Sequence, residues 1–496
     1  MRERLKVKPN TVLSKYIFEP SINEDCKRSF ENIMKVNIAH VLMLNKQGLI
    51  DDSDTKELLK SIIKLYQDGI DNLVLNPDFE DFYFNVEEYI LKDVGIDIGG
   101  KMHTARSRND LNSTVLRMGV REALLKILDL FLNLINSLMK VSKENISTVM
   151  TGYTHMQPAQ PITFGHYLTG IIAALQCDYQ RLIASYKNLN MSPLGGVAFA
   201  GTSFDIDRDF TSYILGFDGI IENSIDAVAS RDYLLEIMSV IATSGTTISR
   251  LAHDLYIWAT DEFKYIEIDN SMAACSSIMP QKKNPIALEH IKAKTSHLLS
   301  SYVSIFSCLK NIPYSHCRDV SEASKEFWNG VEQFQIILRL LDETINTLTI
   351  NKERMEDKIS KNYCTVTELA DELVKQEGIS FRKSHGIVGS LVSDSLERSI
   401  SADELEYENL GKKLREFNVD DMNISEEGMK NALDPSNSVG KRGSVGGPAP
   451  YMVNRFIEKI ETRLKKDRAE YEERLEKIRL ANDNLKDEVA LILTKA

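Results

Sequence analysis

Apolar residues recur at helical spacing along long stretches of the chain that contain no proline. Between Asn112 and Thr148, for example, they recur at Leu124, Leu128 and Phe131, which predicts one long core helix. No run of alternating apolar and polar residues is long enough to predict a sheet. The pattern therefore predicts an all-α fold built around an elongated helical bundle. Further helices are predicted over residues 21–44, 55–66, 80–91, 167–188, 227–263 and 285–309.

The segment 451–496 is dense in Glu, Lys and Arg, and an apolar residue recurs at every seventh position in it. These positions are Ile457, Leu464, Tyr471, Ile478, Leu485 and Ile492. The second apolar line that a coiled coil needs contains Asp467, Arg474 and Glu488 instead. We therefore predict one long helix that packs by a single stripe on its own oligomer, with an independent coiled coil as the alternative.

Length and composition fit a globular protein with several domains. The chain has 496 residues, of which 43% are hydrophobic and 27% charged. A net charge of −12 argues against nucleic acid or an anionic membrane as the main partner, although a local basic pocket remains compatible with it. We predict three domains and a charged helical tail, with limits at 1–105, 106–358, 359–450 and 451–496.

The six cysteines are scattered and form no Cys-x-x-Cys pair, so neither a zinc site nor a disulfide framework is indicated. The first residues lack the apolar core of a signal peptide, and no stretch approaches the roughly 18 apolar residues of a membrane span. We therefore expect a cytoplasmic protein with reduced thiols and no membrane partner.

The segment Ala274–Glu289 gathers polar side chains on a predicted loop. Ser276 and Ser277 come a few residues before Lys282 and Asn284, and prolines restrict the backbone between them. A serine on a closing loop can act as a base if its anion is stabilised, and a lysine can neutralise a substrate carboxylate that gains charge. Taken alone, however, such a segment is more often an ordinary surface loop.

The complete sequence of this loop is similar to a known family signature. Residues 275–285 read Cys-Ser-Ser-Ile-Met-Pro-Gln-Lys-Lys-Asn-Pro, which resembles Gly-Ser-Ser-x-Met-Pro-x-Lys-x-Asn of the fumarase/aspartase superfamily, with Cys275 in place of glycine. Met-Pro-Gln-Lys-Lys-Asn-Pro is the form in the argininosuccinate lyase branch. The resemblance covers roughly residues 20–450 and implies an all-α fold of three domains. It also implies an enzyme that cleaves a C–N or C–O bond and releases fumarate.

Residues 103–112 place two arginines among amide and hydroxyl donors. A guanidinium with neighbouring donors suits a carboxylate, although such a run is more often a helix start capped by Ser107 or Asp110. The segment resembles the branch's Gly-Arg-Ser-Arg-Asn-Asp-Gln. By that resemblance, Ser107, Arg108 and Asn109 bind the succinyl carboxylates of the substrate.

Residues 151–166 contain two prolines and two glycines, which predicts an irregular connection between helices. His155 could exchange a proton near neutral pH, and a carboxylate such as Glu289 would hold its ring, although a lone loop histidine is more often structural. The segment resembles the branch's Thr-Gly-Tyr-Thr-His-Leu-Gln-Pro-Ala-Gln-Pro. By that resemblance, Thr154 and His155 line the active site, and Glu289 is the partner of His155.

Several positions depart from the argininosuccinate lyase pattern. Asn37, His316, Ser321 and Ser324 stand where the branch has serine, tyrosine, glutamine and lysine, which by the resemblance hold the arginine end of the substrate. Each neutral hydrogen bond contributes about 0.5 to 1.5 kcal/mol, so several changes would weaken recognition of that end by a few kcal/mol. The sequence therefore predicts that the elimination reaction of the family is retained, and it leaves open which amine the substrate releases.

The resemblance implies that the chain catalyses an anti elimination from an N-succinyl compound. Ser276 would remove the proton beside a carboxylate, and Lys282 and Asn284 would stabilise the charge that develops there. His155, or Thr154 beside it, would protonate the departing nitrogen. No metal or organic cofactor is expected, because the substrate's own carboxylate takes up the charge.

The resemblance also implies a homotetramer in which each active site combines segments of three subunits. The expected small-molecule partners are the N-succinyl substrate and fumarate. Three functions stay open: argininosuccinate lyase, a related lyase for another N-succinylated amine, and a non-catalytic relative like the lens crystallins of this family.

Overall fold

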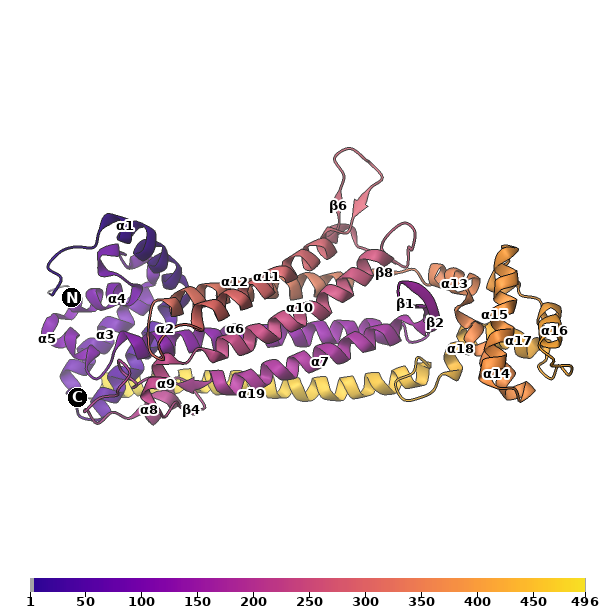
Figure 1. The fold of residues 1–496 in the computed structure, drawn as a ribbon. Coiled ribbons are helices and arrows are strands. Elements are labelled where there is room, and N and C mark those ends of the chain that lie inside the picture. The colour runs from indigo at the N-terminus through magenta and orange to yellow at the C-terminus, as the bar shows by residue number, and fades with distance from the viewer. Residues whose placement is uncertain (1–3, 496) are drawn as a thin grey trace.

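The computed structural model describes residues 4–495 and has an elongated, almost entirely helical architecture. In Figure 1 a bundle of long helices lies between a group of N-terminal helices at the left and a smaller group of C-terminal helices at the right. The all-α prediction is confirmed. Each of the three groups has its own cluster of buried apolar side chains.

The N-terminal group packs α2, α3 and α4 around a buried apolar core. Apolar residues spaced at helical intervals, such as Leu58, Ile62 and Leu65, face this core and are fully buried. The elements are α1 (Thr11–Leu13), a π-helix (Ser14–Phe18), α2 (Glu19–Lys46), α3 (Asp52–Asp68), α4 (Phe82–Val94) and α5 (Ile96–Gly99), with short 3-10 turns at 70–72, 77–79 and 100–103.

Five long helices form the central bundle, and they bury most of the largest core. They are α6 (Arg108–Glu144), α7 (Phe164–Leu189), α10 (Asp232–Trp258), α11 (Ile286–Leu309) and α12 (Asp319–Thr347), with the short helices α8 (Arg208–Ile214) and α9 (Ser224–Ala229) between them. The prediction of a single helix over 227–263 is wrong. Arg231 has φ −141° and ψ 11°, and its guanidinium donates to the carbonyls of Val228 and Ser230 where the first helix ends.

The connection at 151–166 is a β-hairpin, so the predicted irregular structure is also wrong there. Strand β1 (Val149–Thr154) pairs antiparallel with β2 (Gln157–Thr163). Two prolines fit in β2 because both strands of a two-stranded sheet are edges, and an edge strand tolerates a missing N–H donor. The other strands are two-residue pairs: β3 (Met191–Ser192) with β4 (Gly219–Ile220), β5 (Ile266–Glu267) with β8 (Thr349–Ile350), and β6 (Ala274–Cys275) with β7 (Lys283–Asn284).

The C-terminal group is built from short helices around a small separate core that contains Leu369, Leu373 and Ile387. Its elements are α13 (Lys352–Lys361), a 3-10 turn at Tyr363–Thr365, α14 (Val366–Glu377), α15 (Phe381–Glu397), a 3-10 turn at Ala402–Glu404, α16 (Tyr407–Glu416), α17 (Glu426–Leu433) and α18 (Pro435–Lys441).

A single helix, α19 (Pro450–Thr494), then returns along the whole bundle to the N-terminal group (Figure 1). It contacts α6 and α7 along its course and α2, α3 and α8 near its end. The predicted seven-residue stripe is the face that packs: Ile457, Leu485 and Ile492 are buried, and the positions between them pack against the same cores. The stripe is thus covered by the helix's own chain.

Among residues 4–495, no helix combines the length and the apolar character that crossing a membrane requires.

Candidate functional site

The residues singled out from the sequence lie in two separate parts of the chain. We call the junction of the N-terminal group with α6 and α12 the cavity end, because it encloses a cavity of about 220 Å³. We call the β1–β2 hairpin and the β6–β7 segment, with the start of α11, the loop end. Neither that cavity nor the one beneath the β1–β2 hairpin contains residues from both parts.

At the cavity end, Ser107 caps the start of α6. Its hydroxyl accepts a hydrogen bond from the Asn109 N–H at 3.3 Å, and the Asp110 carboxylate accepts from the Ser107 N–H at 3.0 Å, which completes a capping box. Ala105 just before it has a φ of 56°, a left-handed conformation that suits the glycine of the similar motif better. The proposed binding residues therefore also start the helix, as the structural alternative predicted.

Arg108 at this end is held by an ion pair and by an aromatic ring. Its guanidinium donates to the Asp81 carboxylate at 2.7 Å and lies over the ring of Phe84, 3.8 Å from the ring centroid. About a third of the side chain stays exposed. The pair and the ring fix the direction of the guanidinium, which leaves its remaining donors for another anion.

Asp110 has a role beyond the helix cap that the sequence predicted for it. It is fully buried, and besides the α6 cap it accepts hydrogen bonds from the N–H groups of Gly195 and Val197, both at 2.9 Å. Burial raises the pKa of this carboxyl group despite these hydrogen bonds. Asp110 thus ties the glycine-rich segment after β3 to the start of α6, beside Asn109, whose amide donates to the Ala198 carbonyl at 3.0 Å.

The cavity of about 220 Å³ is lined by residues from α2, α4, α6 and the start of α12. His316, Ser321 and Ser324 all line it, so three of the four positions that depart from the family pattern share one space with Asp81. Burial, helped by nearby guanidinium groups, lowers the pKa of His316. A neutral imidazole at this position can accept as well as donate a hydrogen bond.

Asn37, the fourth of these positions, does not line the cavity. It is fully buried in α2, one turn beyond the lining residue Ile33, and neither atom of its amide group has a hydrogen-bond partner within residues 4–495. His40 on the next turn is also buried, and its Nε2 lies 2.8 Å from the Thr104 carbonyl. A direct contact between Asn37 and a ligand would need a rearrangement of the cavity wall.

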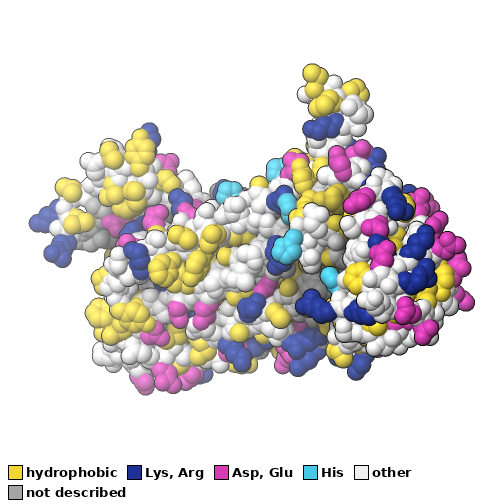
Figure 2. Space-filling model, turned by 45° about the vertical axis from the view of Figure 1, so that its right-hand side comes forward, with side chains coloured by type: hydrophobic (Ala, Val, Ile, Leu, Met, Phe, Trp, Pro, Cys, Tyr) yellow, Lys and Arg dark blue, Asp and Glu magenta, His cyan; other side chains and the backbone are white. Residues whose placement is uncertain are grey.

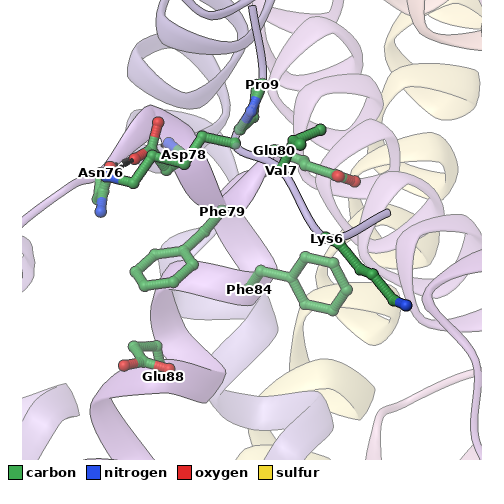
Figure 3. A pocket seen from close by; sticks show the side chains of 10 residues that line it. Lys6, Val7, Pro9, Asn76, Asp78, Phe79, Glu80, Phe84 and Glu88 are labelled. Carbon is green, nitrogen blue, oxygen red and sulfur yellow. Dashed lines mark hydrogen bonds and ion pairs between the residues drawn. The ribbon is translucent and has the colours of Figure 1, made fainter. Parts of the chain in front are cut away.

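A second cavity, of about 450 Å³, lies beside the cavity end. Figure 3 shows the rings of Phe79 and Phe84 next to the N-terminal segment that carries Lys6 and Val7. Phe84 is also the ring that lies under Arg108. The N-terminal segment is thereby connected to the held guanidinium through one aromatic side chain.

At the loop end, β6 and β7 carry a loop that projects far from the bundle (Figures 1 and 2). Ser276 follows β6, and its hydroxyl oxygen accepts hydrogen bonds from the N–H groups of Ile278 at 3.4 Å and Met279 at 3.0 Å. Lys282 is exposed, whereas Asn284 is half-buried in β7. Hydrophobic side chains are visible at the projecting tip in Figure 2, and the side chain of Ile278 is 81% exposed.

Thr154 and His155 lie at the exposed tip of the β1–β2 hairpin, where Thr154 pairs with Gln157. Both line a cavity of about 550 Å³ under the hairpin. Glu289 is exposed on the first turn of α11. Within the part of the chain that the structure describes, His155 and Glu289 form no ion pair, so the single chain does not bring the expected partners together.

Metal ligands are not clustered anywhere in residues 4–495: no group of three or more His, Cys, Asp or Glu side chains is arranged to hold an ion.

Comparison with known proteins identifies two matching family models. Residues 21–299 match the model described as lyase, and residues 363–440 match the model described as argininosuccinate lyase C-terminal. The first covers more than half of the chain and includes every candidate residue up to Glu289.

Two curated relatives match over nearly their whole length. Argininosuccinate lyase 1 of Shouchella clausii is 42% identical over 94% of this chain and 93% of its own. Argininosuccinate lyase of Methanocaldococcus jannaschii is 40% identical over 91% of this chain and 92% of its own.

Among solved structures, EDDS lyase in complex with formate is similar with a TM-score of 0.87 and 31% identity, covering 98% of this chain and 96% of that one. A class II fumarase from Schistosoma mansoni has a TM-score of 0.68 at 17% identity and covers 84% of this chain and 91% of its own, so it shares the fold.

Proposed function

Because the chain belongs to the argininosuccinate lyase branch of the fumarase/aspartase superfamily, we propose that it cleaves argininosuccinate to arginine and fumarate. It is a carbon–nitrogen lyase. The observation that carries the proposal is the 42% identity to an argininosuccinate lyase over nearly the whole chain, together with the intact loop around Ser276, Lys282 and Asn284.

In the proposed reaction, Ser107, Arg108 and Asn109 hold the succinyl carboxylates at the cavity end. The contacts of Arg108 with Asp81 and Phe84 support this role, because a guanidinium already fixed in direction loses little freedom when it binds an anion. The start of α6 adds the partial positive charge of a helix N-terminus next to the same residues.

Ser276 would remove the proton beside one carboxylate of the bound substrate. Two backbone N–H groups already donate to its oxygen, and such donors stabilise a hydroxyl oxygen that has lost its proton. Lys282 and Asn284 would meet the charge that forms on the substrate carboxylate. His155 with Glu289, or Thr154, would protonate the departing nitrogen, which completes the elimination without a net gain of protons.

These groups would meet only in a homotetramer, in which one site takes segments from several copies. Two observations support this assembly. Arg108 lies at the cavity end beside Asp81, while Ser276 projects from the loop end of the same chain. In addition, an exposed apolar stripe on α11 is formed by Leu299, Val303 and Phe306. Side chains three and four positions apart on one helix face suit packing against a second copy.

Mixing two inactive variants tests the shared site. Arg108→Ala and Ser276→Ala would be denatured together, reassembled and assayed for fumarate by its ultraviolet absorbance. Mixed assemblies can combine an intact Arg108 from one copy with an intact Ser276 from another, so activity should return. Each variant refolded alone is the control, and a mixture as inactive as these controls would contradict shared sites.

A lyase for another N-succinylated amine is the second candidate. It is favoured by His316, Ser321 and Ser324, which share the cavity at the positions that differ from the family pattern. A chain of the same fold with 31% identity is moreover named for EDDS and not for argininosuccinate. Asn37 would then act on the amine end only after the cavity wall rearranges.

One assay separates these candidates from the third, a non-catalytic crystallin-like relative. The protein is offered argininosuccinate and, in the reverse direction, fumarate with a panel of amines. Rapid release of arginine supports the first function, and addition to other amines but not to arginine supports the second. Silence with every substrate, equal to a Ser276→Ala control, would favour the non-catalytic relative.

We also propose the domain limits 1–105, 106–358 and 359–450 with the tail at 451–496, and a cytoplasmic location. Separate apolar cores in the N-terminal, central and C-terminal groups support the first proposal. Six cysteines without a disulfide among the described residues support the second.

A further inference from the structure

The tip of the β1–β2 hairpin has a backbone conformation that its residues do not favour. His155 and Met156 have φ values of 52° and 59°, and they lie between the two members of the last strand pair, Thr154 and Gln157. Two consecutive left-handed residues are typical of the two-residue hairpin turn that usually takes Asn and Gly. Side chains with a Cβ disfavour this conformation, so the turn depends on support from the rest of the hairpin.

The hairpin is bent before it reaches this tip. The strand pairing shifts between Thr151 and Tyr153, so that Gly152 lies opposite two residues, Ala159 and Gln160. A Cβ atom on Gly152 would lie only 2.7 Å from the Gln160 carbonyl oxygen, so glycine is required at this close approach. A bulge of this kind redirects the strand beyond it. The direction of the tip is therefore set by the last regular pair before the bulge.

Both members of that pair, Thr151 and Pro161, are held by residues that follow α12 in the sequence. The Asn362 amide donates to the Thr151 hydroxyl oxygen at 2.8 Å, and Thr151 is fully buried. The Arg442 guanidinium donates to the Pro161 carbonyl at 3.3 Å. These two hydrogen bonds come from opposite ends of the C-terminal group: Asn362 precedes α14, and Arg442 follows α18.

The Asn362 side chain is fixed in orientation by its own neighbours. Its amide nitrogen also donates to the Lys358 carbonyl at 2.9 Å, and its oxygen accepts from the Cys364 N–H at 3.0 Å. Asn362 ends α13 and caps the turn that follows it. With all three polar contacts in use, the amide cannot rotate away from Thr151 without losing hydrogen bonds.

We propose that Asn362 and Arg442 are positioning residues for the lyase reaction. Their hydrogen bonds to Thr151 and Pro161, the pair before the bulge, fix the position of His155 at the tip of the hairpin. The C-terminal group would thus serve the reaction by aiming a proton-transfer residue that it does not itself contain. This inference rests on the proposed lyase function, although its structural part can be tested without any substrate.

A double-mutant cycle tests the hydrogen bond between Asn362 and Thr151. Asn362→Ala removes the donor, and Thr151→Val removes the acceptor with little change in volume. Each should lower kcat about 10- to 100-fold with KM nearly unchanged, because a small displacement of a proton-transfer group is costly. The two residues act through one hydrogen bond, so the double variant should be no worse than the poorer single variant.

Three further variants sharpen the result. Lys361→Ala removes a neighbour of Asn362 that pairs with the exposed residue Asp357 and not with the hairpin among residues 4–495, so this variant should keep full activity. Arg442→Ala should lower kcat as Asn362→Ala does, and Arg442→Lys should recover part of the loss because a donor remains near Pro161. The pH dependence of kcat should change in Asn362→Ala and stay as in the unmodified protein in Lys361→Ala.

Hydrogen exchange followed by mass spectrometry separates this proposal from the proposed function. Asn362→Ala should speed exchange in the peptide that spans 149–163, while α6 and α11 keep their protection. If Asn362→Ala speeds exchange in this peptide but the unmodified protein turns over no substrate, the structural role of Asn362 stands and the lyase function is rejected. Unchanged exchange and unchanged kcat, or losses from Asn362→Ala and Thr151→Val that simply add, would overturn the positioning role.

Discussion

The cavity end and the loop end hold their candidate residues in opposite ways. At the cavity end, Arg108 is paired and stacked, and Asp110 is buried with hydrogen bonds to both of its carboxylate oxygens. At the loop end, Ser276 and Lys282 stand on a segment that projects beyond the bundle. In the proposed function, this difference corresponds to a binding site that is prepared before the ligand arrives and a base that joins it on assembly and closure.

This contrast predicts that changes at the loop end cost turnover and leave folding intact. Ser276→Ala should lower kcat about 10²- to 10⁴-fold, the usual contribution of a positioned general base. Its melting temperature should stay the same because the loop packs against little. Fumarate absorbance and a thermal melt measure the two effects, with Ser277→Ala as the matched control. Equal losses in both variants would reject Ser276 as the base.

Near the cavity end, changes should cost stability first. Leu485 of α19 is 6% exposed and belongs to the core of the N-terminal group, so Leu485→Ala should lower the free energy of unfolding by about 2 to 5 kcal/mol. Leu480 on the same helix is 48% exposed, and Leu480→Ala should change it little. Urea denaturation measures both, and similar values would show that α19 is not integral to that core.

Arg108→Lys should separate binding from chemistry at the cavity end. Lysine keeps the charge but loses the planar contact with Phe84 and the forked donors. We expect kcat/KM to fall about 10- to 100-fold, mostly through KM, since a charged hydrogen bond contributes about 1.5 to 3 kcal/mol. Steady-state kinetics measure this, with Arg479→Lys as control because the Arg479 side chain is exposed on α19. A fall confined to kcat would move Arg108 from binding to catalysis.

The smallest expected effect is a pH dependence of stability. Burial lowers the pKa of His40 well below its usual 6.5. Below that value the unfolded chain takes up a proton that the folded chain does not, so stability falls as the pH falls, by up to about 1.4 kcal/mol per pH unit. Denaturation between about pH 5 and 7.5 should show this slope, reduced in His40→Gln. Equal slopes would show that His40 does not cause it.

Periodicity and end signals predicted most of the fold. The long helices α6, α7 and α11 lie within a few residues of their predicted limits because each carries an apolar face and a clear start. The β1–β2 hairpin was missed because its prolines mask any alternation. The break before α10 was missed because it depends on the buried side chain of Arg231, whose partners only folding reveals.

For the candidate site, the motifs predicted which residues to examine but not where they lie. Arg108, His316 and Ser321 come together at the cavity end, whereas Ser276 and His155 belong to projecting segments. A single sequence carries no signal for contacts between copies. Asp110 was predicted as a possible cap of α6, but its hydrogen bonds to Gly195 and Val197 span many positions along the chain and leave no local pattern.

The return of α19 along the bundle has a consequence for synthesis on the ribosome. Leu485 and Ile492 complete the apolar core of the N-terminal group, although they are translated long after the helices α2 to α4 that they pack against. At about 5 to 20 residues per second, the earliest helices must wait tens of seconds or more for them. During that interval they expose apolar surface that chaperones recognise, so we expect the N-terminal group to complete its core only once α19 has left the ribosome.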